Sequence, residues 1–161
     1  MNMRLLAPAL LAAVLIGGCA SFPSSVTPGT ARAQVLANLG APTATHALAS
    51  GTRLQYSLQP LGRQVYNIDL DAAGRVVSVE QVMAQKPFER VQADVWKSTD
   101  LLREFGRPAE ITRVSEFKGD VWTWRFLELN NPRFFHAYVD GQGVVRRWVT
   151  MDEFFNTPKV D

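Results

Sequence analysis

The chain has few of the residues that most often build reactive sites, with one cysteine and two histidines among 161 residues. A lone cysteine cannot form an intramolecular disulfide, so burial of apolar side chains and hydrogen bonds must stabilise the fold. His46 and His136 lie far apart, and neither has neighbours at metal-ligand spacing. A Gly-x-Ser-x-Gly elbow and a phosphate-binding loop are also missing. We therefore expect no metal, no cofactor and no enzymatic activity.

An excess of charge of either sign is missing as well. Lysine and arginine total 17 and aspartate and glutamate total 15, which gives a formal net charge of +2. Such an even balance creates no broad positive field and argues against a nucleic-acid partner. Hydrophobic residues make up 47% of the chain. This is enough for one domain or for two small halves that share a core.

The chain does contain an apolar run near its start, from Leu5 to Ile16, between Arg4 and the sequence Gly17-Gly18-Cys19. One basic residue, a short apolar stretch and small residues before a cut site are typical of a bacterial export signal. The run is too short to span a bilayer as a helix. We predict that residues 1–18 are a cleaved signal peptide.

Small residues directly before a lone cysteine resemble the lipobox of bacterial lipoproteins. The resemblance implies cleavage before Cys19, diacylation of its side chain and acylation of the new N-terminus, which would tie the protein to a membrane. More than one acyl chain is needed for stable anchoring. Ala20 rather than aspartate at the next position implies the outer membrane, with the domain facing the periplasm. The alternative is an ordinary signal peptide followed by a buried cysteine.

The segment after Cys19 is rich in serine, proline, threonine and glycine. We predict that residues 19–29 form a lipidated N-terminus and a flexible tether.

One sequence unit occurs twice in the remaining chain. Val35-Leu36, Leu39, Gly40 and Pro42 recur as Leu101-Leu102, Phe105, Gly106 and Pro108, at a constant offset (106 − 40 and 108 − 42 both equal 66). Such self-similarity indicates a duplicated structural unit. The predicted division is repeat 1 over residues 30–83, a connector over 84–97, repeat 2 over 98–155 and a C-terminal tail over 156–161.

Each repeat begins with apolar residues at helical spacing, over residues 31–39 and 98–105, and ends that helix with glycine and proline. Runs with a period of two follow each helix. The predicted fold is α+β, with two tandem helix-plus-four-strand repeats that form one antiparallel sheet with the helices packed on one face. The expected strands cover residues 45–49, 53–59, 64–69 and 75–82 in repeat 1 and 110–117, 121–129, 133–139 and 144–151 in repeat 2.

The alternation also assigns side chains to the two faces of the expected sheet. The face turned away from the helices is polar in repeat 1, where it carries Gln55, Asn67 and Asp69, and aromatic in repeat 2. Aromatic and arginine side chains are enriched in protein interfaces. The alternative is that a loop or Phe154-Phe155 covers this face. The candidate partner-binding residues are Arg125, Phe134, His136 and Tyr138.

The pattern Gly29, Val35, Leu39-Gly40-x-Pro42, after a lipobox and a short tether, resembles the BamE-like (SmpA/OmlA) family of small outer-membrane lipoproteins. This resemblance implies an envelope protein partner such as the barrel-assembly machinery. Tandem helix-plus-four-strand units resemble the β-lactamase inhibitor protein (BLIP-like) architecture, which implies a protein-binding surface.

We therefore expect a non-enzymatic outer-membrane lipoprotein that binds proteins and takes part in outer-membrane protein assembly or envelope integrity. The alternative is an inhibitor of a periplasmic or extracellular hydrolase, whose active site the hairpin tip Asp140-Gly141 would enter. Asp71 and Asp140 could be taken for paired catalytic carboxylates, but each begins a turn sequence of the form Asp-x-x-Gly. We expect these aspartates to bind their own backbone instead.

Overall fold

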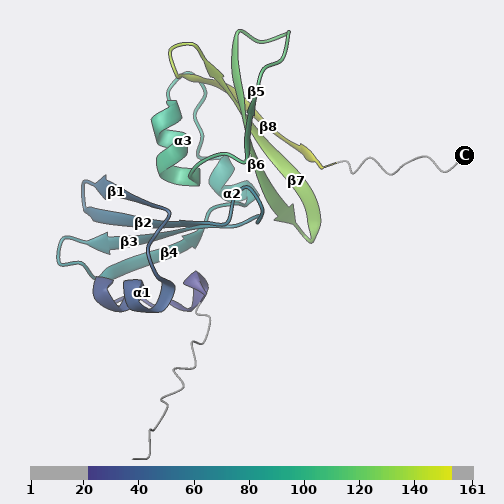
Figure 1. Ribbon diagram of the computed structural model, residues 1–161. Coiled ribbons are helices and arrows are strands. Elements are labelled where there is room, and N and C mark those ends of the chain that lie inside the picture. The colour runs from purple at the N-terminus through teal and green to yellow at the C-terminus, as the bar shows by residue number, and fades with distance from the viewer. Residues whose placement is uncertain (1–21, 154–161) are drawn as a thin grey trace, which may run out of the picture.

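The computed structural model describes residues 22–153, which form two antiparallel four-stranded sheets, three short α-helices and one 3-10 turn (Figure 1). Within these residues no helix is long and apolar enough to cross a bilayer. The elements of the first half are η1 (Pro23–Ser25), α1 (Arg32–Leu39), β1 (Ala44–Leu48), β2 (Gly51–Ser57), β3 (Val65–Asp71) and β4 (Val76–Gln81). Those of the second half are α2 (Gln85–Phe88), α3 (Ser98–Phe105), β5 (Glu110–Thr112), β6 (Gly119–Glu128), β7 (Asn131–Asp140) and β8 (Val145–Asp152).

Strands β1 to β4 pair in chain order and form sheet 1. Helix α1 packs on one face of this sheet, where Val35 is fully buried against a small apolar cluster. The helix ends at Gly40, whose φ of 75° lies in the region that glycine adopts without strain. The sheet residues of this cluster are Leu54, Tyr56, Ile68, Leu70 and Val76.

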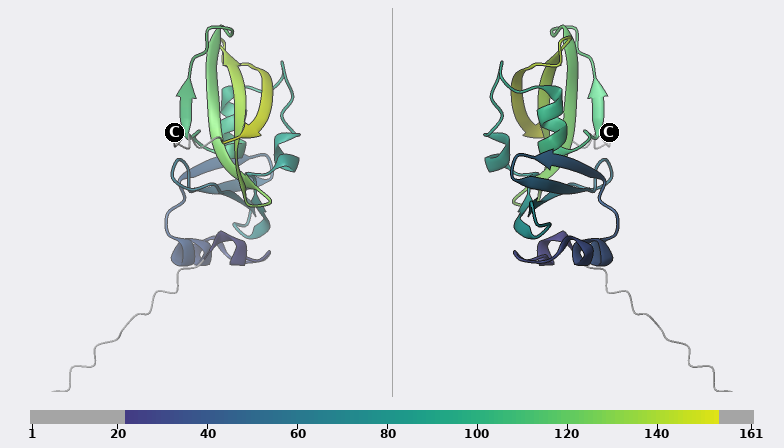
Figure 2. Two further views of the ribbon diagram at one scale, coloured as in Figure 1. Left: turned by 90° about the vertical axis from the view of Figure 1, so that its right-hand side faces the viewer. Right: turned by 90° about the vertical axis from the view of Figure 1, so that its left-hand side faces the viewer.

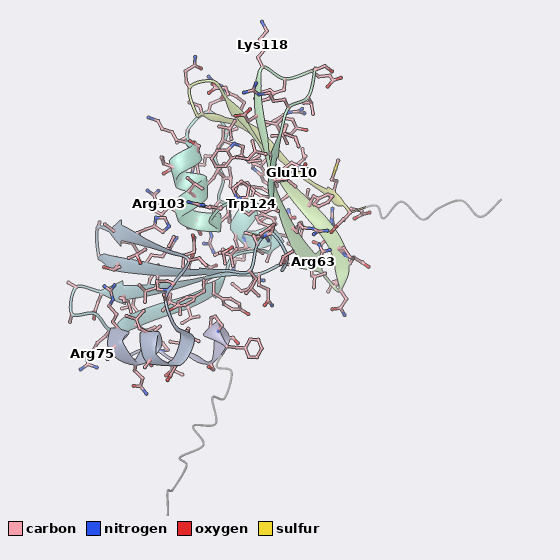
Figure 3. The ribbon with its side chains drawn as sticks, in the orientation of Figure 1. Arg63, Arg75, Arg103, Glu110, Lys118 and Trp124 are labelled. Carbon is pink, nitrogen blue, oxygen red and sulfur yellow. The ribbon has the colours of Figure 1, made fainter. Side chains whose placement is uncertain are left out.

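Strands β5 to β8 pair in chain order and form sheet 2, which packs its inner face against α3. Trp124 lies fully buried between the helix and the sheet (Figure 3), with its ring 6.0 Å from that of Phe105. Its indole nitrogen donates a hydrogen bond of 3.2 Å to the carbonyl oxygen of Gly106, just beyond the end of α3. The largest fully buried side chains of this core are therefore aromatic.

The two halves meet where the carboxyl end of α3 touches the second face of sheet 1. The Asn67 side-chain amide donates to the carbonyl oxygen of Glu104 (2.8 Å), and the Gln55 amide and the Arg53 guanidinium donate to that of Arg103 (3.2 Å each). The last carbonyl groups of a helix have no partner within the helix and carry partial negative charge. Polar side chains of sheet 1 thus satisfy the end of a helix that belongs to the second half.

The predicted α+β fold, with one antiparallel sheet and both helices on one face, is wrong. The described chain is mostly β, and its eight strands form two separate sheets with no strand shared between them. The polar face of sheet 1 is covered as well, since Gln55 and Asn67 are only 1% and 2% exposed. The physical reason is that α3 lies between the sheets, with its apolar side on sheet 2 and its polar carboxyl end on sheet 1.

The segment expected as a flexible tether is bound to sheet 1 over its described part, residues 22–29. Val26 packs against the cluster beneath α1, and the backbone nitrogen of Gly29 donates to the carbonyl oxygen of Val76 (2.7 Å). The guanidinium of Arg75 donates to the carbonyl oxygen of Gly29 (3.1 Å). Sheet 1 therefore holds the chain from Val26 onward.

Candidate functional site

Three of the four candidate partner-binding residues lie in a row on β7. Side chains alternate along a strand, so Phe134, His136 and Tyr138 share the outer face of sheet 2, while Phe135 lies on the inner face with the core. The register between β6 and β7 pairs Arg125 with Phe134, which brings the fourth candidate to the same face. All four side chains are half-buried. We call this surface the outer face of sheet 2.

Strand β8 completes this surface with residues that the sequence analysis did not select. Arg147 lies opposite Tyr138, Val149 opposite His136 and Met151 opposite Phe134. Helices α2 and α3 lie on the other side of the sheet (Figure 1), so no described helix covers these side chains. The period-two pattern of β8 was visible in the sequence, but the pairing partners were not.

Tyr138 is held by contacts on both its face and its edge. The guanidinium carbon of Arg147 lies 3.8 Å from the centre of its ring, a cation–π contact. The ring of Phe117, in the loop between β5 and β6, meets it edge-on at 5.3 Å. This fixed aromatic and arginine pair is of the kind that contributes strongly to protein interfaces.

His136 is a neutral, hydrogen-bonded member of the outer face. Its Nδ1 lies 2.8 Å from the Thr123 hydroxyl oxygen, and its ring centre lies 5.5 Å from that of Phe134. Burial lowers the pKa of His136, and the nearby Glu110 carboxylate opposes that shift only in part. Protonation would place a charge in this partly dry environment, so we expect the imidazole to be neutral at neutral pH.

Stability should depend on pH through His136. Because its folded-state pKa is lowered, the unfolded chain takes up this proton first as the pH falls below about 6.5, and folding stability then decreases. We expect His136→Gln to lose less stability than the natural protein between about pH 7 and about pH 5. Urea unfolding of both proteins at the two pH values measures the difference. Equal losses would show that burial of His136 does not oppose its protonation.

Arg125 is tied to the junction between the two halves. Its guanidinium forms an ion pair with Glu153, which also pairs with Arg63 from the loop between β2 and β3. Burial acts to raise the pKa of Glu153, but its bonds to the two arginines outweigh this effect and lower that pKa. The side-chain amide of Gln59 also donates to the Arg125 carbonyl oxygen (2.6 Å). Arg125 therefore fixes one edge of the outer face.

A cavity of about 320 Å³ lies beside Arg125 and Phe134. Its polar walls come from Glu110 and Thr123, and Pro60 and Ala109 also line it. It adds a recess next to the aromatic row.

The other residues singled out in the sequence lie away from this face. Cys19 and the signal peptide, as well as Phe154-Phe155 and the tail, lie outside the described residues. Asp140 accepts hydrogen bonds from the backbone nitrogens of Gln142 and Val144 and pairs with Arg146, so its carboxylate is occupied within the hairpin turn. Asp71 accepts from the backbone of Arg75 in the matching turn. His46 lies on β1 of sheet 1, and residues 22–153 contain no group of three potential metal ligands.

Comparison with known proteins adds little to this picture. No protein-family model matches the chain, and no curated protein matches it at a significant level. The chain is similar to a solved structure, a DUF4309 family protein (YjgB) from Bacillus subtilis, at 10% identity and a TM-score of 0.32. That match covers 78% of this chain and 79% of the other. A likeness at this level says nothing about function.

Proposed function

We propose that the protein is a lipid-anchored, non-enzymatic module of the outer membrane that binds an envelope protein through the outer face of sheet 2. The observation that carries the proposal is the row of Phe134, His136 and Tyr138, flanked by Arg125 and Arg147 and left uncovered by the described helices. Aromatic rings and arginines at the centre of an interface supply most of its binding free energy.

The lipid anchor rests on the sequence before Cys19. An apolar segment, two glycines and then the lone cysteine of the chain support lipidation and export. An envelope location would bring the outer face within reach of membrane-protein partners. The resemblance to the BamE-like family makes the barrel-assembly machinery our first candidate, and envelope integrity is the wider role that we propose.

Loss of two rings should abolish partner capture. We expect Phe134→Ala combined with Tyr138→Ala to retain a cooperative thermal transition but to weaken binding by about 2 kcal/mol or more, as for other aromatic hot spots. The lipidated protein is used to capture partners from detergent-solubilised envelopes, with bound proteins identified by mass spectrometry.

The matched control is Val77→Ala, which removes an apolar side chain that is 52% exposed on β4 of sheet 1. It should capture the same proteins as the natural chain. Loss of the cooperative transition in the double variant would make the two rings core residues and contradict the proposal. Specific recovery of a hydrolase would contradict the assembly role and favour an inhibitor.

A further inference from the structure

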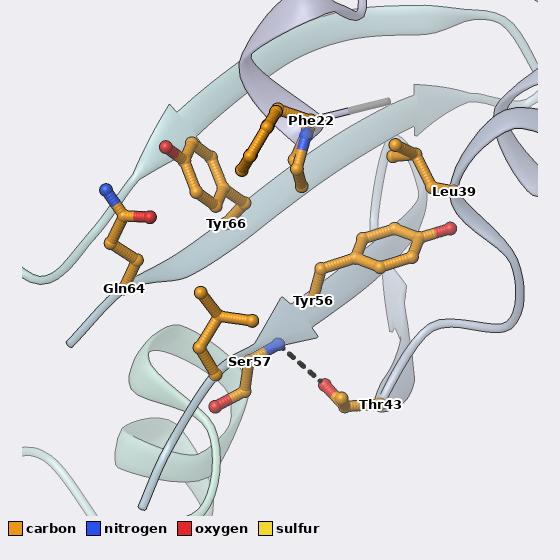
Figure 4. Close-up of a pocket in the computed structure, with 9 residues that line it drawn as sticks. Phe22, Leu39, Thr43, Tyr56, Ser57, Gln64 and Tyr66 are labelled. Carbon is orange, nitrogen blue, oxygen red and sulfur yellow. Dashed lines mark hydrogen bonds between the residues drawn. The ribbon is translucent and has the colours of Figure 1, made fainter. Parts of the chain in front are cut away.

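An apolar cleft of about 320 Å³ opens at the start of the described chain, between η1, α1 and sheet 1 (Figure 4). Phe22 and Tyr66 form one side of it, and Leu39 and Tyr56 form the other. The Tyr56 hydroxyl donates to the carbonyl oxygen of Gly40 (3.0 Å), which fixes that ring in the wall. None of the described residues that line the cleft is charged. The cleft can therefore accept an apolar group without burying an unpaired charge.

Two apolar side chains stand exposed where the cleft opens. Phe22 is 64% exposed and Leu58 is 53% exposed, and both line the cleft. Single exposed apolar residues are common on protein surfaces. Here the two lie together at one apolar recess, so an apolar group that entered it would remove both side chains from water.

Covalent geometry places this cleft close to the proposed lipid anchor. Phe22 is the third residue after Cys19, and three residues span at most about 11 Å even when fully extended. The headgroup region on each side of a bilayer is roughly 5–8 Å thick. If Cys19 carries lipid, Phe22 cannot lie far beyond the headgroups.

We propose that the cleft is a second membrane-contact site, which takes an acyl chain from phospholipid of the leaflet that holds the anchor. Phe22 and Leu58 enter the interfacial layer, and Tyr66 lies there with one apolar and one polar end, as tyrosines do at membrane surfaces. The site depends on the proposed lipidation of Cys19. Figures 1 and 2 show η1 and α1 at one end of the molecule and sheet 2 at the other, so this contact directs sheet 2 away from the bilayer.

Tryptophan fluorescence can test this contact, because the four native tryptophans all lie between Trp96 and Trp148, outside the half of the chain that forms the cleft. Leu58→Trp adds a probe at the cleft, and Ile111→Trp adds one on β5 at a position of matched exposure, 52% against 53%. The lipidated variants are reconstituted in vesicles of phosphatidylethanolamine and phosphatidylglycerol whose acyl chains are brominated. We expect most of the fluorescence added by Leu58→Trp to be lost and that added by Ile111→Trp to be retained.

Flotation of the lipidated protein with the vesicles shows that it is bound to them. If the bound protein then shows equal quenching of the two variants, or no quenching of Leu58→Trp, the contact site is overturned and the proposed function stays intact. Phe22→Trp provides a second probe at the cleft if Leu58→Trp does not fold, and the same results are expected from it. Mass spectrometry of the mature protein is the companion measurement. A Cys19 without lipid would overturn both the anchor and the contact site.

Discussion

Replacing Phe88 by alanine is expected to lower the free energy of unfolding by about 3–5 kcal/mol, the usual cost of removing a fully buried phenylalanine. Phe88 has no exposed surface, and its ring stacks on that of Phe135 at 4.2 Å and meets that of Phe126 edge-on at 4.9 Å. The same cluster contains Val65 and Val82 from the first half of the chain. The loss should therefore destabilise both halves together.

Urea unfolding, followed by both fluorescence and circular dichroism, measures this effect. Phe88→Leu keeps part of the apolar side chain and should lose less stability than Phe88→Ala. It provides the measurement if the alanine variant does not fold. Leu61→Ala is the control, because Leu61 is 94% exposed and its truncation should change little. A loss from Phe88→Ala of less than about 1 kcal/mol would contradict a core shared by both halves.

Replacing Arg53 by alanine should have the second large effect, a loss of about 3 kcal/mol, because it leaves the largely buried Asp69 without its cation and Glu104 with only the more exposed Arg90. The Arg53 side chain is 12% exposed and bonds Asp69 through Nε (2.7 Å) and Nη2 (2.9 Å) and Glu104 through Nη1 (2.6 Å). Burial acts to lower the pKa of Arg53, but the bonds to both carboxylates outweigh it and raise that pKa. Arg53 therefore remains charged and joins sheet 1 to α3.

The matched control for Arg53→Ala is Arg113→Ala. Arg113 also pairs with an aspartate, Asp120, at 2.9 Å, but its side chain is 84% exposed. Ion pairs in such exposed positions add little to stability, so the control should unfold like the natural protein. Arg53→Lys cannot reproduce the forked guanidinium and should lie between the two. Equal stability of Arg53→Ala and Arg113→Ala would show that the junction does not depend on this arginine.

Individual strands could be predicted from the sequence because each has one face in a core. The run expected over residues 64–69 is β3 (Val65–Asp71), and that expected over 133–139 is β7 (Asn131–Asp140). A period of two with one buried face fixes both the strand and its orientation. Strand β5 is shorter than expected and ends at Thr112, since the following residues form the loop that places Phe117 on Tyr138.

The relation between the two sheets could not be predicted in this way. Gln55 and Asn67 have the polar character of a solvent-exposed face, yet they are buried because they bind backbone carbonyl groups of α3. Phe88 lies in the segment expected as a connector over residues 84–97, where a single helical turn has too few residues to show a period. Both contacts join residues far apart in the chain, and local patterns do not reveal them.

The candidate site was predicted in part. Alternation along one strand was enough to group Phe134, His136 and Tyr138 on one face. This inference does not require the pairing of that strand with any other. The stacking of Arg147 on Tyr138 depends on the β7–β8 register, which shifts at an irregularity just after Tyr138. The ion pair of Arg125 with Glu153 likewise joins β6 to the residue just after β8, and these two strands are not neighbours in the sheet. Sequence reasoning therefore placed these side chains on one face but did not reveal the contacts that fix them.

The most direct test of the proposed binding role is site-specific photocrosslinking in intact cells. A photoreactive phenylalanine analogue replaces Phe134 or Tyr138 on the outer face of sheet 2. In the control proteins the same analogue replaces Val77 or Ile111, which are exposed apolar residues away from that face. Our account predicts one discrete crosslinked envelope protein from positions 134 and 138 and none from the controls. No crosslinked product at 134 and 138, or the same product from the control positions, would contradict it.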